Sequence, residues 1–193
     1  MTATTADVPA MTTDATPSFD GATFRRALGH VPTSVCIVTL SDELGDAGMT
    51  VGSFTSISLE PPLVGFFVDA RSSTLTRLRT ASRMTVNLLN DAQGELCYRF
   101  AKPSDDRFAG VDLVPGDHPA PRFAESVAWI DCAVDQMVTV GDHELIVGRV
   151  LDFEVPSWPR RPLVFFRGVL SQLDARTVPS ASSWSRDHYG DEW

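Results

Sequence analysis

The sequence predicts a mostly β domain whose sheet closes on itself, with a few short helices. Short runs of β-branched and aromatic residues recur along the chain, and glycine, proline or aspartate separates them. Few segments carry a helical pattern, and no strand is followed by the glycine-rich fingerprint of a dinucleotide-binding βαβ unit. Together these observations favour a barrel over a doubly wound sheet.

The chain begins with a segment that is rich in Thr, Ala, Asp and Pro, so residues 1–17 are predicted to be a disordered leader. A first helix follows, for which Ser18 is the predicted N-cap. Within it Phe24, Ala27 and Leu28 share one face before a glycine ends the helix.

The central elements follow in quick succession. Four runs have strand composition: 34–40, 50–59, 63–68 and 84–89. A short helix is predicted over Ser73–Ala81, between the last two of these strands. A further helix, capped by Asn90 or Asp91, runs to about Ala101.

A long loop and a hairpin make up the next part of the chain. Residues 102–126 form a Pro-, Asp- and Gly-rich loop, and loops of that length are usually functional or disordered. The two strands 128–140 and 144–155 flank Gly141-Asp142, a dipeptide typical of a hairpin turn.

A Pro-rich loop, 156–162, leads to a last strand over 163–170. The domain is therefore expected to span residues 18–173. A polar tail, 174–193, contains Trp184, Tyr189 and Trp193, and either packs on a partner subunit or is disordered.

Composition excludes several classes of function. A chain of 193 residues with 43% hydrophobic content suits one domain, and a net charge of −9 argues against nucleic-acid binding. The three cysteines, Cys36, Cys97 and Cys132, lack metal-ligand spacing and are expected to be core thiols in a reducing cytoplasm. No metal site, membrane span or secretory signal is predicted.

The run Gly48–Pro62 is the most informative stretch. It is rich in hydroxyl side chains, contains a second glycine at position 52, and carries no charge before Glu60. Uncharged donors on a rigid strand suit a planar, heteroatom-rich ring, although a Ser/Thr-rich strand with one solvated face has the same pattern.

Three further motifs lie in order along the chain: Arg71–Thr74, Gly141–His143 and Arg161–Gly168. With Gly48–Pro62 they resemble the flavin reductase-like family over about Phe19–Leu173. The resemblance implies a split β-barrel of the FMN-binding type and an NAD(P)H-dependent flavin reductase that supplies reduced flavin to a separate monooxygenase. It also implies a homodimer whose flavin pocket is completed across the subunit interface.

The resemblance assigns cofactor-binding roles residue by residue. The strand lining the flavin ring corresponds to Thr50, Val51, Ser53, Phe54 and Thr55. The turn that takes the ribityl and phosphate end corresponds to Asp69, Arg71, Ser72, Ser73 and Thr74, and a later segment near the flavin tail to Arg99, Phe100 and Lys102. For Arg71 and the two serines the physics agrees, because a cation and a helix start favour an anion.

His143 matches the family histidine that contacts the nicotinamide dinucleotide, and it is the one residue expected to act in catalysis. One position departs from the family pattern, since many members carry Asn where this chain has Gly52. That departure bears on flavin affinity and on the choice between FMN and FAD. FAD is favoured over FMN by overall likeness, and NADH over NADPH because no arginine cluster adjoins Gly141–His143.

Two alternatives stay open at this point. A barrel of the same architecture could bind or carry flavin without turning over NADH, but such a carrier has no use for a nicotinamide contact. An oxidase of the pyridoxine phosphate type would require a basic substrate pocket, which the sequence does not show.

Overall fold

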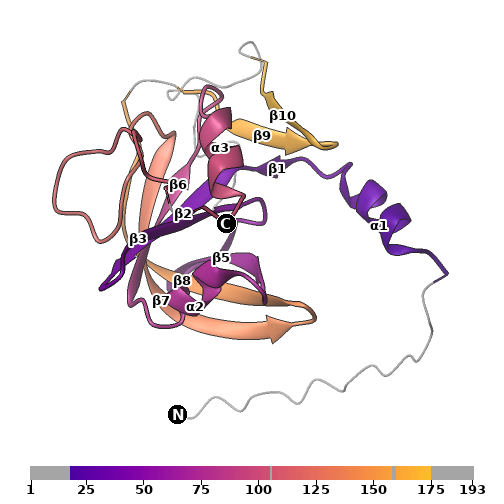
Figure 1. Ribbon diagram of the computed structural model, residues 1–193, viewed down its shortest axis with the longest axis horizontal. Coiled ribbons are helices and arrows are strands. Elements are labelled where there is room, and N and C mark those ends of the chain that lie inside the picture. The colour runs from indigo at the N-terminus through magenta and orange to yellow at the C-terminus, as the bar shows by residue number, and fades with distance from the viewer. Residues whose placement is uncertain (1–17, 105, 158–159, 175–193) are drawn as a thin grey trace.

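The structure is a computed structural model that describes residues 18–104, 106–157 and 160–174 (Figure 1). The predicted disordered leader, and all of the predicted tail beyond residue 174 with its three aromatic residues, lie outside these residues. The described chain forms a seven-stranded antiparallel sheet and a separate three-stranded sheet. The mostly β fold predicted from the sequence is confirmed.

Three short helices accompany the strands: α1 (Gly21–Leu28), α2 (Ser73–Leu78) and α3 (Gly94–Phe100). The large sheet has the order β3 (Gly45–Val51), β2 (Cys36–Asp42), β6 (Arg83–Leu88), β7 (Ala128–Val140), β8 (His143–Glu154), β5 (Pro62–Asp69), β4 (Thr55–Leu59). The small sheet has the order β1 (Thr33–Ser34), β9 (Leu163–Phe166), β10 (Val169–Gln172).

The large sheet curls enough to bring its two edge strands near each other where the chain passes from one to the other. Its edge strands, β3 and β4, are consecutive in the chain, and the three residues 52–54 that join them can span only about 10 Å. The segment 52–54 is also bonded to β5, because the hydroxyl of Ser53 accepts a hydrogen bond from the N–H of Phe67 at 2.9 Å. Among the described residues no backbone pairing joins β3 to β4, so the curled sheet stays open between these two strands.

The predicted single strand over 50–59 is therefore wrong. β3 pairs with β2, whereas β4 pairs with β5, so the chain leaves one edge of the sheet at Val51 and joins the other at Thr55. Strand propensity is equally high on both sides of the break and does not show that the neighbouring strand changes.

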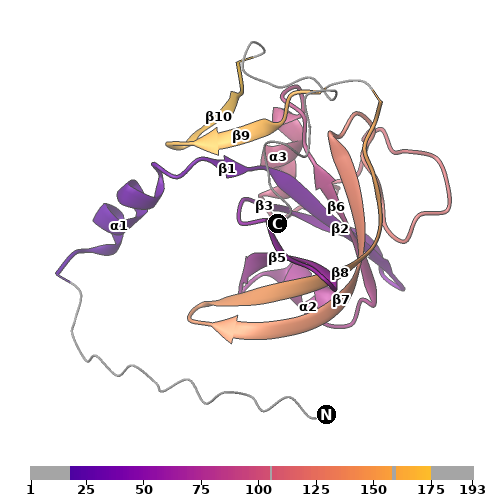
Figure 2. The same cartoon turned by 180° about the vertical axis from the view of Figure 1, so that it is seen from behind.

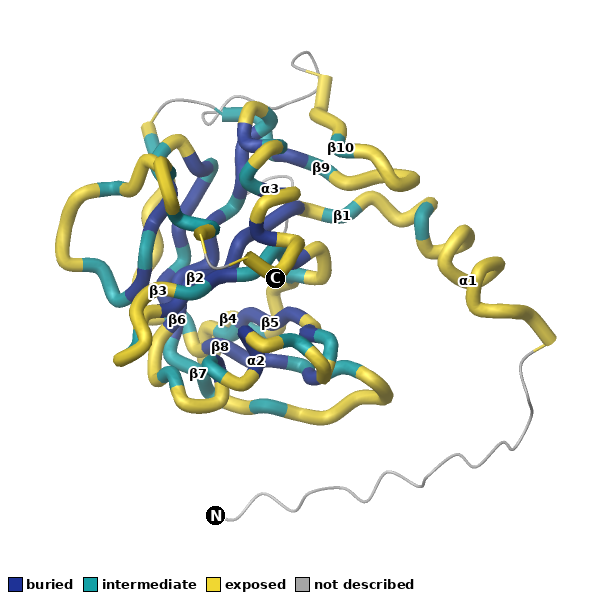
Figure 3. The backbone as a smooth tube through the Cα atoms, viewed as in Figure 1, coloured by how far each residue is buried: buried dark blue, intermediate teal, exposed yellow. Residues whose placement is uncertain are grey.

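Two hydrophobic cores result. The first fills the curled sheet and is closed by Leu75 and Leu78 of α2. The second lies between β2, α3 and β9, and includes Phe100 of α3. Figure 3 shows the buried strands running through the middle of the molecule. Gly48 allows the second core to form, since a Cβ there would lie 3.0 Å from the Phe100 ring.

The predicted last strand over 163–170 is also corrected. It is a hairpin of β9 and β10, turned at Arg167 and Gly168, whose φ angles are 53° and 83°. Two central residues with positive φ make the tight turn whose twist matches that of antiparallel strands. The first helix differs as well, because its N-cap is Asp20 rather than Ser18, and Asp20 Oδ1 accepts from Thr23 N–H at 2.7 Å.

The three cysteines are free and buried, which confirms that they are core thiols. Burial raises the pKa of the Cys36 and Cys132 thiols to about 12, so both stay protonated at neutral pH. The described part of the chain contains no helix with the length and hydrophobicity that a bilayer crossing requires.

Candidate active site

A hollow of about 630 Å³ opens where three elements meet: the end of β3, the turn from β5 into α2, and the end of α3. We call it the main hollow. Predicted cofactor-binding residues that line it are Thr50, Asp69, Arg71, Ser72, Ser73, Thr74, Phe100 and Lys102. Residues from three separate sequence segments are thus brought to one place.

The turn after β5 carries a tight ion pair. Arg71 donates from Nε to one oxygen of Asp69 at 3.0 Å and from a terminal nitrogen to the other at 2.7 Å. The Arg71 guanidinium holds the pKa of Asp69 well below its usual range, so this carboxylate stays ionised at neutral pH. Ser72, the N-cap residue of α2, makes no capping bond with its side chain. Its hydroxyl therefore remains available to a ligand.

The opposite wall of the main hollow joins β3 to α3. Thr50 donates its hydroxyl hydrogen to the Cys97 carbonyl at 2.7 Å, so its side chain ties the strand to the helix. The lone pairs of the Thr50 hydroxyl oxygen remain free to accept a hydrogen bond from a ligand. Phe100 is buried against Phe108 and Phe123, and Lys102 is exposed at the rim.

Several predicted residues do not line the main hollow. The Val51 side chain is in the first core, Ser53 bonds the β5 backbone, Phe54 packs against the first core and Thr55 is exposed on β4. Their predicted contact with a flavin ring stays a prediction. Arg99 faces a different hollow and donates to the Ala109 carbonyl at 2.9 Å.

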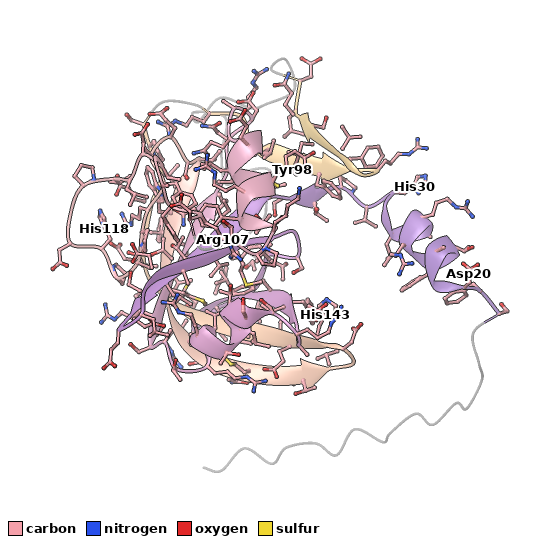
Figure 4. The ribbon with its side chains drawn as sticks, viewed as in Figure 1. Asp20, His30, Tyr98, Arg107, His118 and His143 are labelled. Carbon is pink, nitrogen blue, oxygen red and sulfur yellow. The ribbon has the colours of Figure 1, made fainter. Side chains whose placement is uncertain are left out.

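His143 begins β8 and lies directly opposite Asp69 of β5 in the antiparallel register. Figure 4 shows it beside α2. Its Nδ1 is 2.7 Å from Asp142 Oδ1, and this hydrogen bond lowers the pKa of Asp142. An ionised carboxylate only accepts, so Nδ1 carries the proton and Nε2 is the nitrogen left to face a ligand.

Sequence reasoning missed Arg107, which lines the main hollow together with Met49, Ala101 and Pro103. It donates to the Gly48 carbonyl of β3 at 2.5 Å, and Figure 4 shows it beside this strand. The length of the loop over 102–126 predicts a functional or disordered segment, but no motif marks this arginine within it. Among the described residues, no three His, Cys, Asp or Glu side chains gather as a metal site would require.

The profile of the family described as "Flavin reductase like domain" matches residues 28–174, which is most of the chain. The chain belongs to this family. A flavin reductase of Pseudomonas putida is 42% identical over 146 residues, 75% of this chain and 85% of the relative. An NADH:FMN oxidoreductase of Rhodococcus erythropolis is 39% identical over 171 residues, 86% of this chain and 89% of the relative.

Solved structures of family members share the fold. The NADH:FAD oxidoreductase SgcE6 of Streptomyces globisporus, in complex with NAD and FAD fragments, matches with a TM-score of 0.77 at 34% identity. The match covers 82% of this chain and 96% of that one. The split β-barrel of this chain is thus the flavin reductase fold.

Proposed function

We propose that this flavin reductase-like protein transfers a hydride from NADH to FAD or FMN and supplies the reduced flavin to a separate monooxygenase. The main hollow carries this proposal, because it gathers hydroxyl groups, the Arg71–Asp69 pair and the ring of Phe100 in a member of the family. His143 lies on β8, directly opposite Asp69 of the neighbouring strand β5, and Asp69 lines the main hollow.

The residues have distinct parts in this scheme. Ser72, Ser73 and Arg71 bind the phosphate end of the flavin, β3 positions its ring, and Phe100 and Lys102 lie near its tail. His143 orients the nicotinamide through Nε2. The flavin and the nicotinamide together supply the hydride chemistry, and the protein supplies orientation and exclusion of water.

Relatives support a separate acceptor of reduced flavin. They include HsaB of Mycobacterium tuberculosis, the reductase subunit of a flavin-dependent monooxygenase, at 34% identity. The three free cysteines fit a reducing compartment such as the cytoplasm. A steady-state assay tests the activity: purified protein with added FAD or FMN should oxidise NADH in air, and a protein that does not would refute the proposal.

The phosphate assignment predicts a selective loss of flavin affinity. Arg71→Ala or Ser72→Ala should weaken flavin binding about tenfold each, because a charge-assisted or direct hydrogen bond is lost. Asp69→Asn should have the opposite effect on flavin affinity. It frees Arg71 from its carboxylate partner and should therefore strengthen flavin binding. Fluorescence titration measures all three, and parental affinity in both alanine variants would remove the phosphate assignment.

We further propose a homodimer. Helix α1 projects from the body of the protein in both views (Figures 1 and 2), and it buries none of its residues. Phe24 and Leu28 are about half exposed on one face, and neighbouring exposed apolar side chains often mark a protein–protein interface. A second copy of the chain would cover them.

Light scattering tests the assembly. The parent should have twice the chain mass at micromolar concentration, and Phe24→Ser/Leu28→Ser should shift it towards the monomer. Replacing two exposed polar residues of the same helix, Thr23→Ser/Arg26→Gln, should leave the mass unchanged. A fully active parental monomer would contradict the proposal.

A further inference from the structure

The main hollow has three walls that are not neighbours in the sequence: the end of β3 at Thr50, the turn after β5 at Asp69, and the end of α3 at Phe100. Its width depends on what holds these walls at a fixed separation. Thr50 joins the first wall to the third, because its hydroxyl donates to the Cys97 carbonyl of α3 at 2.7 Å. The first and second walls need another connection, since β3 and β5 are not neighbours in the described sheet.

Ser53 makes that connection. Its hydroxyl accepts from the Phe67 N–H at 2.9 Å and donates to the Phe67 carbonyl at 3.3 Å. Ser53 follows the end of β3 by two residues, and Phe67 precedes Asp69 by two residues on β5, which is about 7 Å along a strand. One side chain thus bonds the segment that leaves β3 to the strand that carries Asp69.

These two bonds take the place of a missing strand residue. The N–H and C=O of one strand residue point to the same side, where a neighbouring strand normally pairs with both. β4 begins at Thr55, opposite Gly65, so it has no residue opposite Phe67. A hydroxyl both donates and accepts, and the Ser53 side chain therefore satisfies both backbone groups of Phe67.

The exposure of this contact argues against a role in stability. Ser53 is exposed and Phe67 is 40% exposed, so water can replace the hydroxyl when it is removed. Its loss should therefore leave the thermal stability close to the parental value. What the loss changes is position, because the segment 52–54 and the end of β3 then become free to move relative to β5.

We propose that Ser53 is a positioning residue. Its hydroxyl sets the separation of the β3 and β5 walls, and thereby the place of the flavin ring, by bonding Phe67 rather than by touching the flavin. The inference rests on the proposed function, in which β3 positions the flavin ring. It gives Ser53 a part different from the direct flavin contact that the family resemblance implies.

Three variants of the full-length protein test the proposal. Ser53→Ala removes the hydroxyl, whereas Ser53→Thr keeps it and Ser53→Val has the shape of the threonine without it. In the protein without flavin, the Ala and Val variants should speed hydrogen exchange of the Phe67 amide about tenfold, because one hydrogen bond is lost. Ser53→Thr should keep the parental exchange rate.

The kinetics should follow the same division. The Ala and Val variants should lower kcat for flavin reduction about tenfold, since a misplacement of about 1 Å can cost on the order of 10²-fold. Ser53→Thr should retain most of the parental kcat. Ser56→Ala is the matched control, because Ser56 is exposed on β4 and its hydroxyl makes no hydrogen bond to the described residues. It should leave Phe67 exchange and kcat at parental values.

The outcomes separate positioning from direct contact. A loss of kcat with parental Phe67 exchange would show that the hydroxyl touches the flavin, and would overturn the proposal. Faster Phe67 exchange with parental kcat would overturn it as well. If Ser53→Ala fails to fold, the threonine and valine variants decide. A parent that oxidises no NADH refutes the proposed function, and flavin affinity then tests the inference: it should fall in the Ala and Val variants and stay parental in Ser53→Thr.

Discussion

His143→Ala is expected to lower kcat/KM for NADH by on the order of 10²-fold while flavin affinity stays near the parental value. The Nδ1 of His143 is held by Asp142, so the ring presents Nε2 in one orientation. Removing such a contact lets the hydride donor move, and a misplacement of about 1 Å can cost a factor of this size.

Steady-state kinetics on the folded variant, with flavin binding titrated separately, measures both quantities. His30→Ala is the matched control, because His30 is exposed and its Nδ1 contacts the Arg26 carbonyl at the end of α1. It should have parental kinetics. A structural role for His143 would instead lower thermal stability and weaken both cofactors together, and unchanged NADH kinetics would remove this histidine from the site.

The second large effect concerns stability. Arg122 is 4% exposed and pairs with the buried Asp131 of β7 and with Glu154 of β8. Arg122→Met should lower the free energy of unfolding by about 3–5 kcal/mol, because it leaves the Asp131 carboxylate buried without its cation. Urea denaturation measures the change.

A surface pair provides the control. Arg149 contacts Asp135 from a side chain that is half exposed, so Arg149→Met should cost less than about 1 kcal/mol. The double variant Arg122→Met/Asp131→Leu should recover stability relative to Arg122→Met, since no unpaired charge remains. A loss below about 1 kcal/mol in Arg122→Met would show that Asp131 does not depend on Arg122 for its burial in the folded state.

Local sequence signals predicted much of the fold. The hairpin at Gly141-Asp142 and the start of the helix after Ser72 are predicted correctly, whereas that helix ends at Leu78, three residues before its predicted end at Ala81. Turn residues and strand composition act over a few positions, so local signals reach these features. The break of the predicted strand at residues 52–54 was not foreseen, because it depends on which distant strand each half pairs with.

The residues of the site also differ in whether local sequence signals can predict them. The turn from Asp69 to Thr74 was predicted because its residues are contiguous and carry a motif. Arg107 was not, because its place in the site depends on the path of a long loop that brings it to Gly48, far away in the sequence. Arg99 looked equivalent to Lys102 in the sequence, but the rotation of α3 directs it into a different hollow.

An anaerobic reaction of NADH with FAD tests the central claim most directly. With a catalytic amount of the protein, the nicotinamide and flavin absorbance bands should decay together, one NADH for each flavin reduced, and much faster than without protein. A protein that binds FAD tightly but leaves both bands unchanged would contradict the account, and would identify the chain as a flavin carrier.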